Sequence, residues 1–516
     1  MNSSTMSRPL AIVLLLSSWA SLSCSQGPYA ELDPDAFVSP SSNHSWNTSS
    51  PASEALNTQS GMGASLRQVV EYTEVPTGEQ SLLHLTDFAL RNKPETRAAW
   101  ERSRMAAAQY GIVRGEWYPT LGIEADLSFN RIMFPATGEA FFIEQFQFVP
   151  SLNLNYLLLD FGRREADDDA ARAKLWAANL EFDRAIQQTI HDVQVTYFGL
   201  DAALALNEAA QRNLDLAQTV VDMVEQQLIV GLATMPEMLF ARQRLAQARF
   251  DLESTVAGIS VAQSALLKSC GLPSIVPITI ARLQEHSITE HLDIRVEDVI
   301  AQTLSSRPDL AAAVSEVKAA QAQVSRAEAE FMPQVSVFGS LGGIATRYQT
   351  EVTDNPNAAS NETFPWTNAA TDLWSVGLSG SWMIFEGFQR ENSVRFARAA
   401  RRQAEENLRS LRLSAISETW DAYFRVQAAT RQYEFGEALL ESSEESFAAV
   451  QASFMQGLAT ITQLVQAEKD LQDARSTLVN TRADLLTSAS DLAFAAGAES
   501  GRFIPTKPSR EVAAQQ

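Results

Sequence analysis

The sequence contains little of what secreted domains and helical membrane proteins use for stability. Its 516 residues include two cysteines, Cys24 and Cys270, so no intrachain disulfide is expected once Cys24 is modified or removed. After residue 24 there is no apolar run of about 18 residues, the length of a membrane-spanning helix, and 20% of all residues are charged. Together these observations exclude a helical protein with several membrane spans.

Motifs for catalysis and metal binding are also missing. The five histidines lack the spacing of a zinc site, and we expect His286 and His291 to be solvated in a connector beside glutamates. The sequence has no phosphate-binding glycine loop and no Gly-x-Ser-x-Gly motif. The formal charge of −22 argues against nucleic acid or anionic lipid as the main partner. We therefore expect no enzyme, no cofactor and no metal site.

The two ends of the chain have the composition of segments outside the fold. Residues 1–24 have the pattern of a secretory signal, with Arg8, an apolar run at 10–16 and small residues before Cys24. Cys24 is a candidate lipidation site, although Leu22 stands one place nearer to it than in the usual lipobox, so cleavage without lipidation stays an alternative. Residues 25–78 predict an extended or disordered arm, and residues 501–516 a disordered tail. With either processing the protein is exported.

Between these ends, one kind of junction occurs twice. In residues 152–158, Leu152, Leu154, Tyr156 and Leu158 fall on one side of the chain, and Asn153 and Asn155 on the other. This is the two-residue period of a strand. After the Asp-Phe-Gly segment at 160–162 the sequence becomes rich in Arg, Glu, Asp and Ala without proline, which predicts a helix. The same change occurs after residues 376–384, at the Phe-Glu-Gly segment 385–387.

Constant offsets between matching motifs predict a tandem duplication. Pro94 precedes Pro308 by 214 positions (308 − 94), and Asp160 precedes Glu386 by 226 (386 − 160). The Gly-Leu-Ala-Thr segment at 231–234 recurs at 457–460 with the second offset. The difference of 12 places an insertion between the strands of the second copy. We assign repeat 1 to residues 79–283 and repeat 2 to residues 284–500.

Each repeat is predicted to contain two shorter helices, two strands and two long helices. In repeat 1 the first helix begins near Leu82, and the second runs from Pro94 to about Gly115. The strands cover 121–130 and 152–159, with a loop at 131–145. One long helix runs from 163 to about 230, and the next returns to about Lys268. In repeat 2 the helices begin near Val296 and Pro308, the strands cover 335–344 and 373–385 around a loop at 345–371, and long helices cover about 388–456 and 461–495.

The predicted strands favour a membrane barrel that several copies share. Each has about ten residues, enough to cross the hydrocarbon at a barrel tilt, with one apolar and one polar face. A soluble sheet on a core stays an alternative, because alternation alone fits both. In lipid every strand edge must be paired, so four strands cannot close a barrel, whereas three copies supply twelve. Apolar stripes along the long helices predict that they pair over their length, and hairpins pointing one way would form a hollow tube.

These features together resemble the TolC family of trimeric outer-membrane factors, the exit ducts of Gram-negative efflux pumps and type I secretion systems. The match covers about residues 80–500. It rests on the strand starts at 118–121 and 332–335, the LDFGRR and FEGFQR junctions, the two Gly-Leu-Ala-Thr turns and the segment 266–273.

The resemblance implies an α+β membrane protein, with a homotrimeric twelve-stranded outer-membrane β-barrel continuous with a long periplasmic α-helical barrel. It implies a periplasmic adaptor protein, an inner-membrane efflux transporter or ABC exporter, and outer-membrane lipid as partners, with cargo left open. A lipidated Cys24 would resemble the OprM-like and CusC-like branch. We expect a passive export channel; the alternative is a secreted coiled-coil structural or adhesive protein.

The resemblance also implies two sites. The two turns are expected to dock the adaptor, although each is also explained as a tight helix reversal with a left-handed glycine. At the periplasmic gate, Gln463 and Gln466 stand where the family carries aspartates, and Ala459 stands where some members have an arginine, opposite Glu237. This predicts a neutral amide constriction instead of an ionic lock, unless the glutamines face a neighbouring helix. The docking residues are Gly231, Leu232, Ala233, Thr234, Gly457, Leu458, Ala459 and Thr460.

Overall fold

The computed structural model describes residues 41–44, 78–136, 139–283, 295–353 and 361–497. Among them, residues 106–175 and 316–404 form a first unit, here called the strand unit. Residues 78–105, 176–283, 295–315 and 405–497 form a second, here called the helix unit. The predicted signal segment with Cys24, the predicted arm apart from residues 41–44 and 78, and the predicted tail lie outside the described residues.

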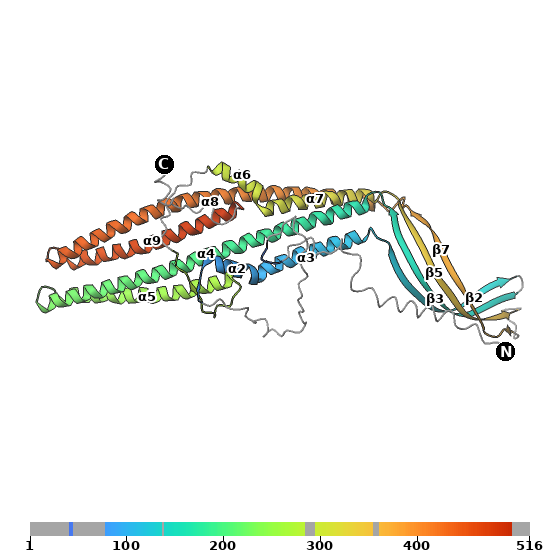
Figure 1. Cartoon of the computed structure of the whole chain (residues 1–516), viewed down its shortest axis with the longest axis horizontal. Helices are drawn as coiled ribbons and strands as arrows, with labels where there is room; N and C mark the ends of the chain where they lie inside the picture. The colour runs from blue at the N-terminus through green and yellow to red at the C-terminus, as the bar shows by residue number, and fades with distance from the viewer. Residues whose placement is uncertain (1–40, 45–77, 137–138, 284–294, 354–360, 498–516) are drawn as a thin grey trace, which may run out of the picture. The chain divides into compact units, whose positions relative to one another are not determined.

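Helices of four lengths occur twice, in the same order along the chain (Figure 1). Pro94 and Pro308 each occupy the first position of a 22-residue helix, where a missing N–H costs no hydrogen bond. The observed bounds confirm the predicted helices to within one or two residues. The helices are α2 (Leu82–Asn92), α3 (Pro94–Gly115), α4 (Arg163–Ile229) and α5 (Met235–Ser269), then α6 (Val296–Ser306), α7 (Pro308–Ala329), α8 (Gln389–Met455) and α9 (Ile461–Ala495).

Judged by length and apolar composition, none of the helices in the described part of the chain could cross a membrane. Two residues of β1 (Glu79–Gln80) pair in parallel with two of β4 (Thr279–Ile280), which joins the start of the described fold to the connector after α5.

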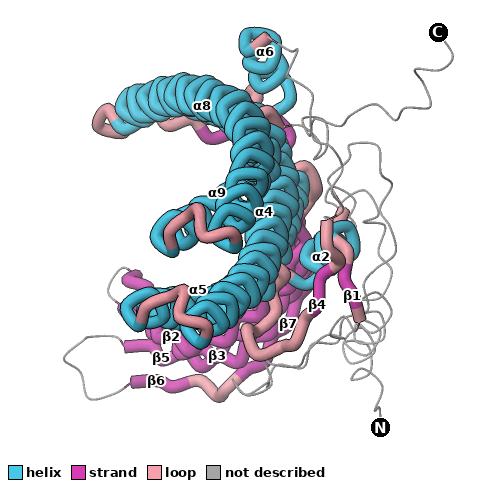
Figure 2. Tube along the Cα trace, turned by 90° about the vertical axis from the view of Figure 1, so that its left-hand side faces the viewer, coloured by secondary structure: helices cyan, strands magenta, loops and turns pink. Residues whose placement is uncertain are grey.

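One antiparallel sheet, drawn in magenta in Figure 2, joins strands from both halves of the chain in the order β2-β3-β5-β7. The register pairs Leu127 with Phe148 and Leu341 with Trp374, so apolar side chains of neighbouring strands share one face. Among the described residues, the outer edges of β2 and β7 pair with no strand. The strands are β2 (Thr120–Ala136), β3 (Glu139–Leu159), β5 (Gln334–Thr353) and β7 (Thr367–Ser381), with β6 (Asn361–Thr363) on the end of β5.

The loops predicted at 131–145 and 345–371 are wrong over most of their length. β2 continues to Ala136 and β3 begins at Glu139, while β5 continues to Thr353 and β7 begins at Thr367. β7 also ends at Ser381, before the predicted strand end at 385. Loop-forming residues misled the prediction, because the strands are extended by pairing between distant segments, as where Phe142 meets Glu351.

Both strand-to-helix junctions contain two consecutive residues in the left-handed backbone region. In the first, Phe161 and Gly162 have φ of 54° and 93°; in the second, Gly387 and Phe388 have φ of 61° and 64°. Glycine adopts this conformation without strain, whereas phenylalanine does not. Each junction therefore holds one strained phenylalanine beside one glycine.

The second residue of each following helix is an arginine that joins the segments of the junction. Arg164 Nε donates to Asp160 Oδ2 at 3.0 Å, and Arg390 Nε donates to Glu386 Oε2 at 3.2 Å. Each guanidinium also donates to one carbonyl after the preceding helix and to one at or just after the end of the strand, which ties three segments to one side chain. These carbonyls belong to Glu116 and Leu158 for Arg164, and to Glu330 and Met383 for Arg390.

The core of the helix unit lies in the seams between its long helices, which run side by side in both views (Figures 1 and 2). The seam nearest the helix turns combines residues of all four long helices, and we call it the tip cluster. Its fully buried members include Val224 of α4, Met238 and Ala241 of α5, and Leu464 of α9. The four helices are therefore held together by apolar contacts close to their turns.

Candidate functional site

An uncovered apolar face is the main feature of the strand unit. Leu121, Ile123 and Leu127 of β2 are 65–77% exposed, and Trp374, Val376 and Leu378 of β7 are 70–75% exposed. The opposite face carries polar side chains such as Glu124 and Asn153, and Asn153 donates to Glu124 Oε2 at 2.9 Å. Nothing among the described residues covers this apolar face.

Charged and aromatic side chains border this face at the end of the sheet away from the helices. Arg131 of β2 forms ion pairs at 3.0 Å with Glu144 of the neighbouring strand β3 and with Glu351 of β5, the strand beyond it. Next to this cluster, the rings of Phe129 and Phe146 stack at 4.6 Å between centroids. At the other end of the strands, the junctions carry exposed aromatic residues: Trp117, Tyr118, Phe161, Trp382, Phe385 and Phe388. The apolar band therefore has aromatic borders at both ends.

The two Gly-Leu-Ala-Thr turns reverse the hairpins through left-handed glycines. Gly231 and Gly457 have φ of 78° and 72°. Backbone N–H groups of Leu232 and Leu458 donate to the carbonyls of Gln227 and Ser453 at 2.8 and 2.9 Å, which closes the last turn of each preceding helix. Both leucine side chains are 79% exposed. The turns therefore have the local geometry of a tight reversal and also present an apolar side chain outward.

The residues predicted for the gate bind within their own helices. Thr234 N–H donates to Glu237 Oε2 at 2.6 Å, and Thr460 N–H donates to Gln463 Oε1 at 2.8 Å, so both are capping-box residues. The hydrogen bonds that the backbone N–H and the hydroxyl of Thr234 donate lower the pKa of Glu237. Gln466 is exposed and donates to Asp470 Oδ1 at 2.7 Å. The three predicted gate residues therefore have their hydrogen-bond partners on the same helix or its cap, and their gate role stays a prediction.

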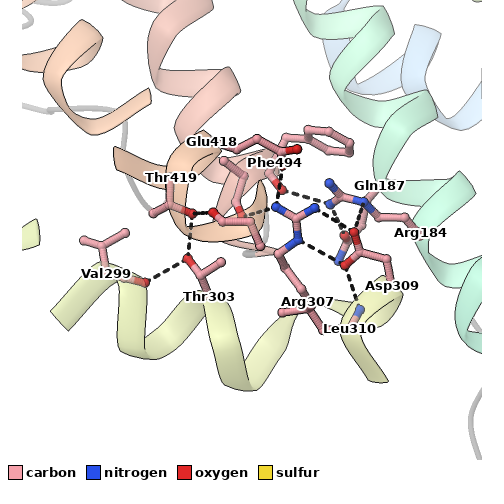
Figure 3. A network of polar contacts seen from close by, with 12 residues as sticks. Arg184, Gln187, Val299, Thr303, Arg307, Asp309, Leu310, Glu418, Thr419 and Phe494 are labelled. Atoms are coloured by element: carbon pink, nitrogen blue, oxygen red, sulfur yellow. Dashed lines mark hydrogen bonds and ion pairs between the residues drawn. The ribbon is translucent and has the colours of Figure 1, made fainter. Parts of the chain in front are cut away.

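Sequence reasoning missed a buried polar network that joins the two halves of the helix unit (Figure 3). Arg307, 3% exposed, donates to Asp309 Oδ2 and to Glu418 Oε2, each at 2.6 Å. From α4, Arg184 donates to the carbonyl of Phe494 at 2.9 Å and stacks on its ring. Burial lowers the pKa of Arg184 to about 10, although Asp309 opposes the shift. The network fixes the end of α9 to α4.

Corresponding residues of the first half form a second ionic contact. Lys93 Nζ donates to Asp192 Oδ2 at 2.6 Å, and these two residues precede Arg307 and Glu418 by the offsets 214 and 226. Beside them, His191 Nε2 lies 2.7 Å from Asp491 Oδ1 of α9. Burial would lower the pKa of His191, but the nearby carboxylates of Asp192 and Asp491 raise it to about 9. The constant offsets were the signal in the sequence that could have indicated both ion pairs.

In the part of the chain that the structure describes, no group of three or more His, Cys, Asp or Glu residues could hold a metal ion. Cys270 lies in the apolar core of the helix unit, where burial raises the pKa of its thiol to about 11. The functional features of the described residues are thus an apolar sheet face, two exposed turns and polar contacts between helices.

Comparisons with known proteins agree with these features. A family model described as "Outer membrane efflux protein" matches residues 85–272 and 299–498. "Protein CyaE" of Bordetella pertussis is 25% identical over 439 residues, which are 84% of this chain and 87% of CyaE. The "Cation efflux system protein CusC" of Escherichia coli K12 is 25% identical over 75% of this chain and 80% of its own. The crystal structure of the outer membrane protein VceC of Vibrio cholerae matches this chain with a TM-score of 0.67 and 21% sequence identity. The match covers 81% of this chain and 96% of VceC, so the two share a fold.

Proposed function

The chain belongs to the outer membrane efflux protein family, and we propose that it is the passive exit duct of a tripartite efflux or type I secretion system. The observation that carries this proposal is the uncovered apolar face of the sheet, whose side chains are stable against lipid and unstable against water. The polar opposite face would line an aqueous passage. Nothing in this role requires catalysis, and we propose that the protein is not an enzyme.

Open edges and open helix faces support assembly into a homotrimer. β2 and β7 have unpaired edges among the described residues, and a barrel in lipid must close them. Within the chain, Gln187 of α4 donates to the carbonyl of Gly497, just after α9, and Gln194 of α4 accepts from Ser490 of α9. Their counterparts 226 positions later, Leu413 and Trp420 of α8, are 63% and 47% exposed. We propose that this face meets α5 of the next copy, so that three copies close a twelve-stranded barrel and a ring of hairpins built from repeats 79–283 and 284–500.

The test of assembly uses purified protein and light scattering in detergent. Wild type is expected as a trimer, and Leu413→Glu combined with Trp420→Glu as a monomer, because two charges would be buried at the interface. Ser442→Glu combined with Ser446→Glu adds the same charge at other exposed positions of α8 and should leave the trimer intact. A wild-type chain that carbonate releases from membranes without detergent would contradict the exit-duct proposal.

We further propose that the exposed Leu232 and Leu458 dock a periplasmic adaptor, which links the duct to an inner-membrane efflux transporter or an ABC exporter. Their exposure at the hairpin ends supports this role, because single leucines in water contribute nothing to the fold there. Replacing either by Asp should abolish export while the trimer yield stays unchanged. Export at the wild-type rate in both variants would refute docking at the turns.

For the gate, we propose that Gln466, together with Gln463 and Glu237, borders the narrow end of the duct. The exposed amide of Gln466 supports this placement, while the capping bonds of the other two limit their freedom to face the axis. Gln463→Asp combined with Gln466→Asp should make the reconstituted channel more cation-selective in planar bilayers. An unchanged reversal potential under a salt gradient would place the constriction elsewhere. For Cys24 we propose lipidation, which mass spectrometry of the mature protein would test.

A further inference from the structure

A carboxylate is buried where the two hairpins meet. Glu468 of α9 is 3% exposed, and Leu464 and Leu471, about one helical turn on either side of it, belong to the tip cluster. The charged group that acts on Glu468 is Arg244 of α5, whose neighbours one turn away also belong to that cluster. Two charged side chains therefore stand in an otherwise apolar seam.

These two charged groups do not satisfy each other's hydrogen bonds. Glu468 Oε2 and Arg244 Nε are both buried without a hydrogen-bond partner among the described residues. Burial raises the pKa of the Glu468 carboxyl, and Arg244 only partly opposes this shift. An unpaired buried carboxylate destabilises the packed state more than a distant counter-charge stabilises it. The seam is therefore weaker at this level than an entirely apolar seam would be.

Farther from the turns, the same helix makes complete polar contacts. Gln472 Nε2 donates to Asp251 Oδ2 of α5 at 3.3 Å, and Arg475 Nη1 donates to Asn213 Oδ1 of α4 at 3.1 Å. The first-half counterpart of Glu468 is Arg242, 226 positions earlier, and it is exposed. The weak part of the seam is thus due to α9 alone. It lies between the turn before α9 and Gln472, the residue that makes the hydrogen bond to α5.

We propose that Glu468 makes the tip of the α5–α9 seam separable, so that the two hairpins part there while their upper contacts hold. Separation would hydrate Glu468 and the buried Nε of the half-exposed Arg244, and so remove the cost of burying these atoms without hydrogen-bond partners. The inference rests on the proposed duct, because it assigns to the seam near the turns the control of how readily that end opens. Glu468 acts through the packing of the helices and needs no contact with cargo.

Hydrogen exchange of the purified full-length protein tests this proposal. Glu468→Leu, which replaces the carboxylate by an apolar side chain, should slow amide exchange in segments 461–471 and 238–248 by about tenfold. Arg244→Leu should speed exchange there, because the carboxylate loses the one counter-charge that acts on it among the described residues. The double variant should return to slow exchange. Asp473→Leu removes an exposed carboxylate from the same helix and should leave exchange unchanged.

The outcomes separate this proposal from the exit duct itself. Unchanged or faster exchange in Glu468→Leu, with the trimer intact, would overturn the role of Glu468. Should the leucine variant fail to fold, Glu468→Gln removes the charge at nearly constant shape, and the proposal then requires slower exchange in that variant. Planar-bilayer conductance of wild type tests the duct independently. Slow exchange in Glu468→Leu without any wild-type conductance would refute the duct and support the separable seam.

Discussion

The strand unit and the helix unit place similar apolar side chains in opposite environments. Trp374 and Val376 project from a single-layer sheet with nothing described against them, whereas Leu464 and Leu485 are completely buried between helices. In the sheet, strand pairing satisfies the backbone polar groups, but no described residue covers the apolar face. In the helix unit, the helices bury their apolar side chains against one another. The difference supports the proposal that one chain is adapted to two media, lipid for the sheet and water for the helices.

The largest expected effect would come from a cavity in the helix unit. Leu485→Ala should lower the free energy of unfolding by about 2–5 kcal/mol, because the side chain lies in a closed apolar core. Leu378→Ala removes the same atoms from the exposed sheet face and should cost far less in detergent. Urea unfolding of both variants measures the difference. Equal costs would mean that the sheet face is covered by protein.

The second largest effect should come from a charge placed on the apolar face of the sheet, compared with the same charge on the opposite face. Val376→Arg is expected to destabilise membrane insertion by about 2–4 kcal/mol, because the guanidinium would face the hydrocarbon. Ser375→Arg places the same charge on the neighbouring residue of the opposite face, where water is expected, and should be tolerated. The yield of folded protein in the outer-membrane fraction distinguishes them. Similar losses in both would contradict the assignment of the faces.

The helix unit should show a pH dependence that comes from His191. His191 has a pKa raised to about 9, above its usual 6.5, so its charged form stabilises the fold. This stabilisation is complete below about pH 6.5 and is lost as the pH rises through about 9. Thermal unfolding of wild type from pH 6 to 10 should show the loss, and His191→Gln should abolish it. His84→Gln, at an exposed position, should behave like wild type.

The smallest expected effect concerns the helix caps. Thr460→Ala removes the side chain that accepts from Gln463 N–H and should cost about 1 kcal/mol. Thr462→Ala, two residues later and exposed, has no capping role and should be close to neutral. Guanidinium unfolding at fixed protein concentration would detect the difference. If Thr460→Ala leaves the free energy of unfolding unchanged, the capping box does not hold Gln463 in place.

Local signals in the sequence were sufficient for the helices and insufficient for much of the sheet. Pro94 and Pro308 mark helix starts, and Gly231 and Gly457 mark the reversals, because each satisfies a backbone requirement within a few residues. The ends of the strands depend on partners such as Phe142 and Glu351, which lie about two hundred residues apart, so no local pattern could define them.

The candidate sites divide in the same way. The exposed turns and the two-faced strands follow from local periodicity. The contact of Arg184 with Phe494, across 310 residues, depends on tertiary packing and could not be read from either segment alone. The capping boxes were readable, since Thr-x-x-Glu and Thr-x-x-Gln begin both returning helices, and they explain why Glu237 and Gln463 bind their own helix starts.

The two strand-to-helix junctions limit which residues the two halves of the chain can exchange as their sequences diverge. Phe-Gly in one and Gly-Phe in the other satisfy the same pair of left-handed residues, so the backbone requires the shape and tolerates either order. A copy can therefore exchange the two residues, or hold glycine at both, without changing where Arg164 or Arg390 finds its carbonyls. Losing the single glycine would put two strained side chains in succession. Drift after duplication is thus confined to sequences that keep at least one glycine in each junction.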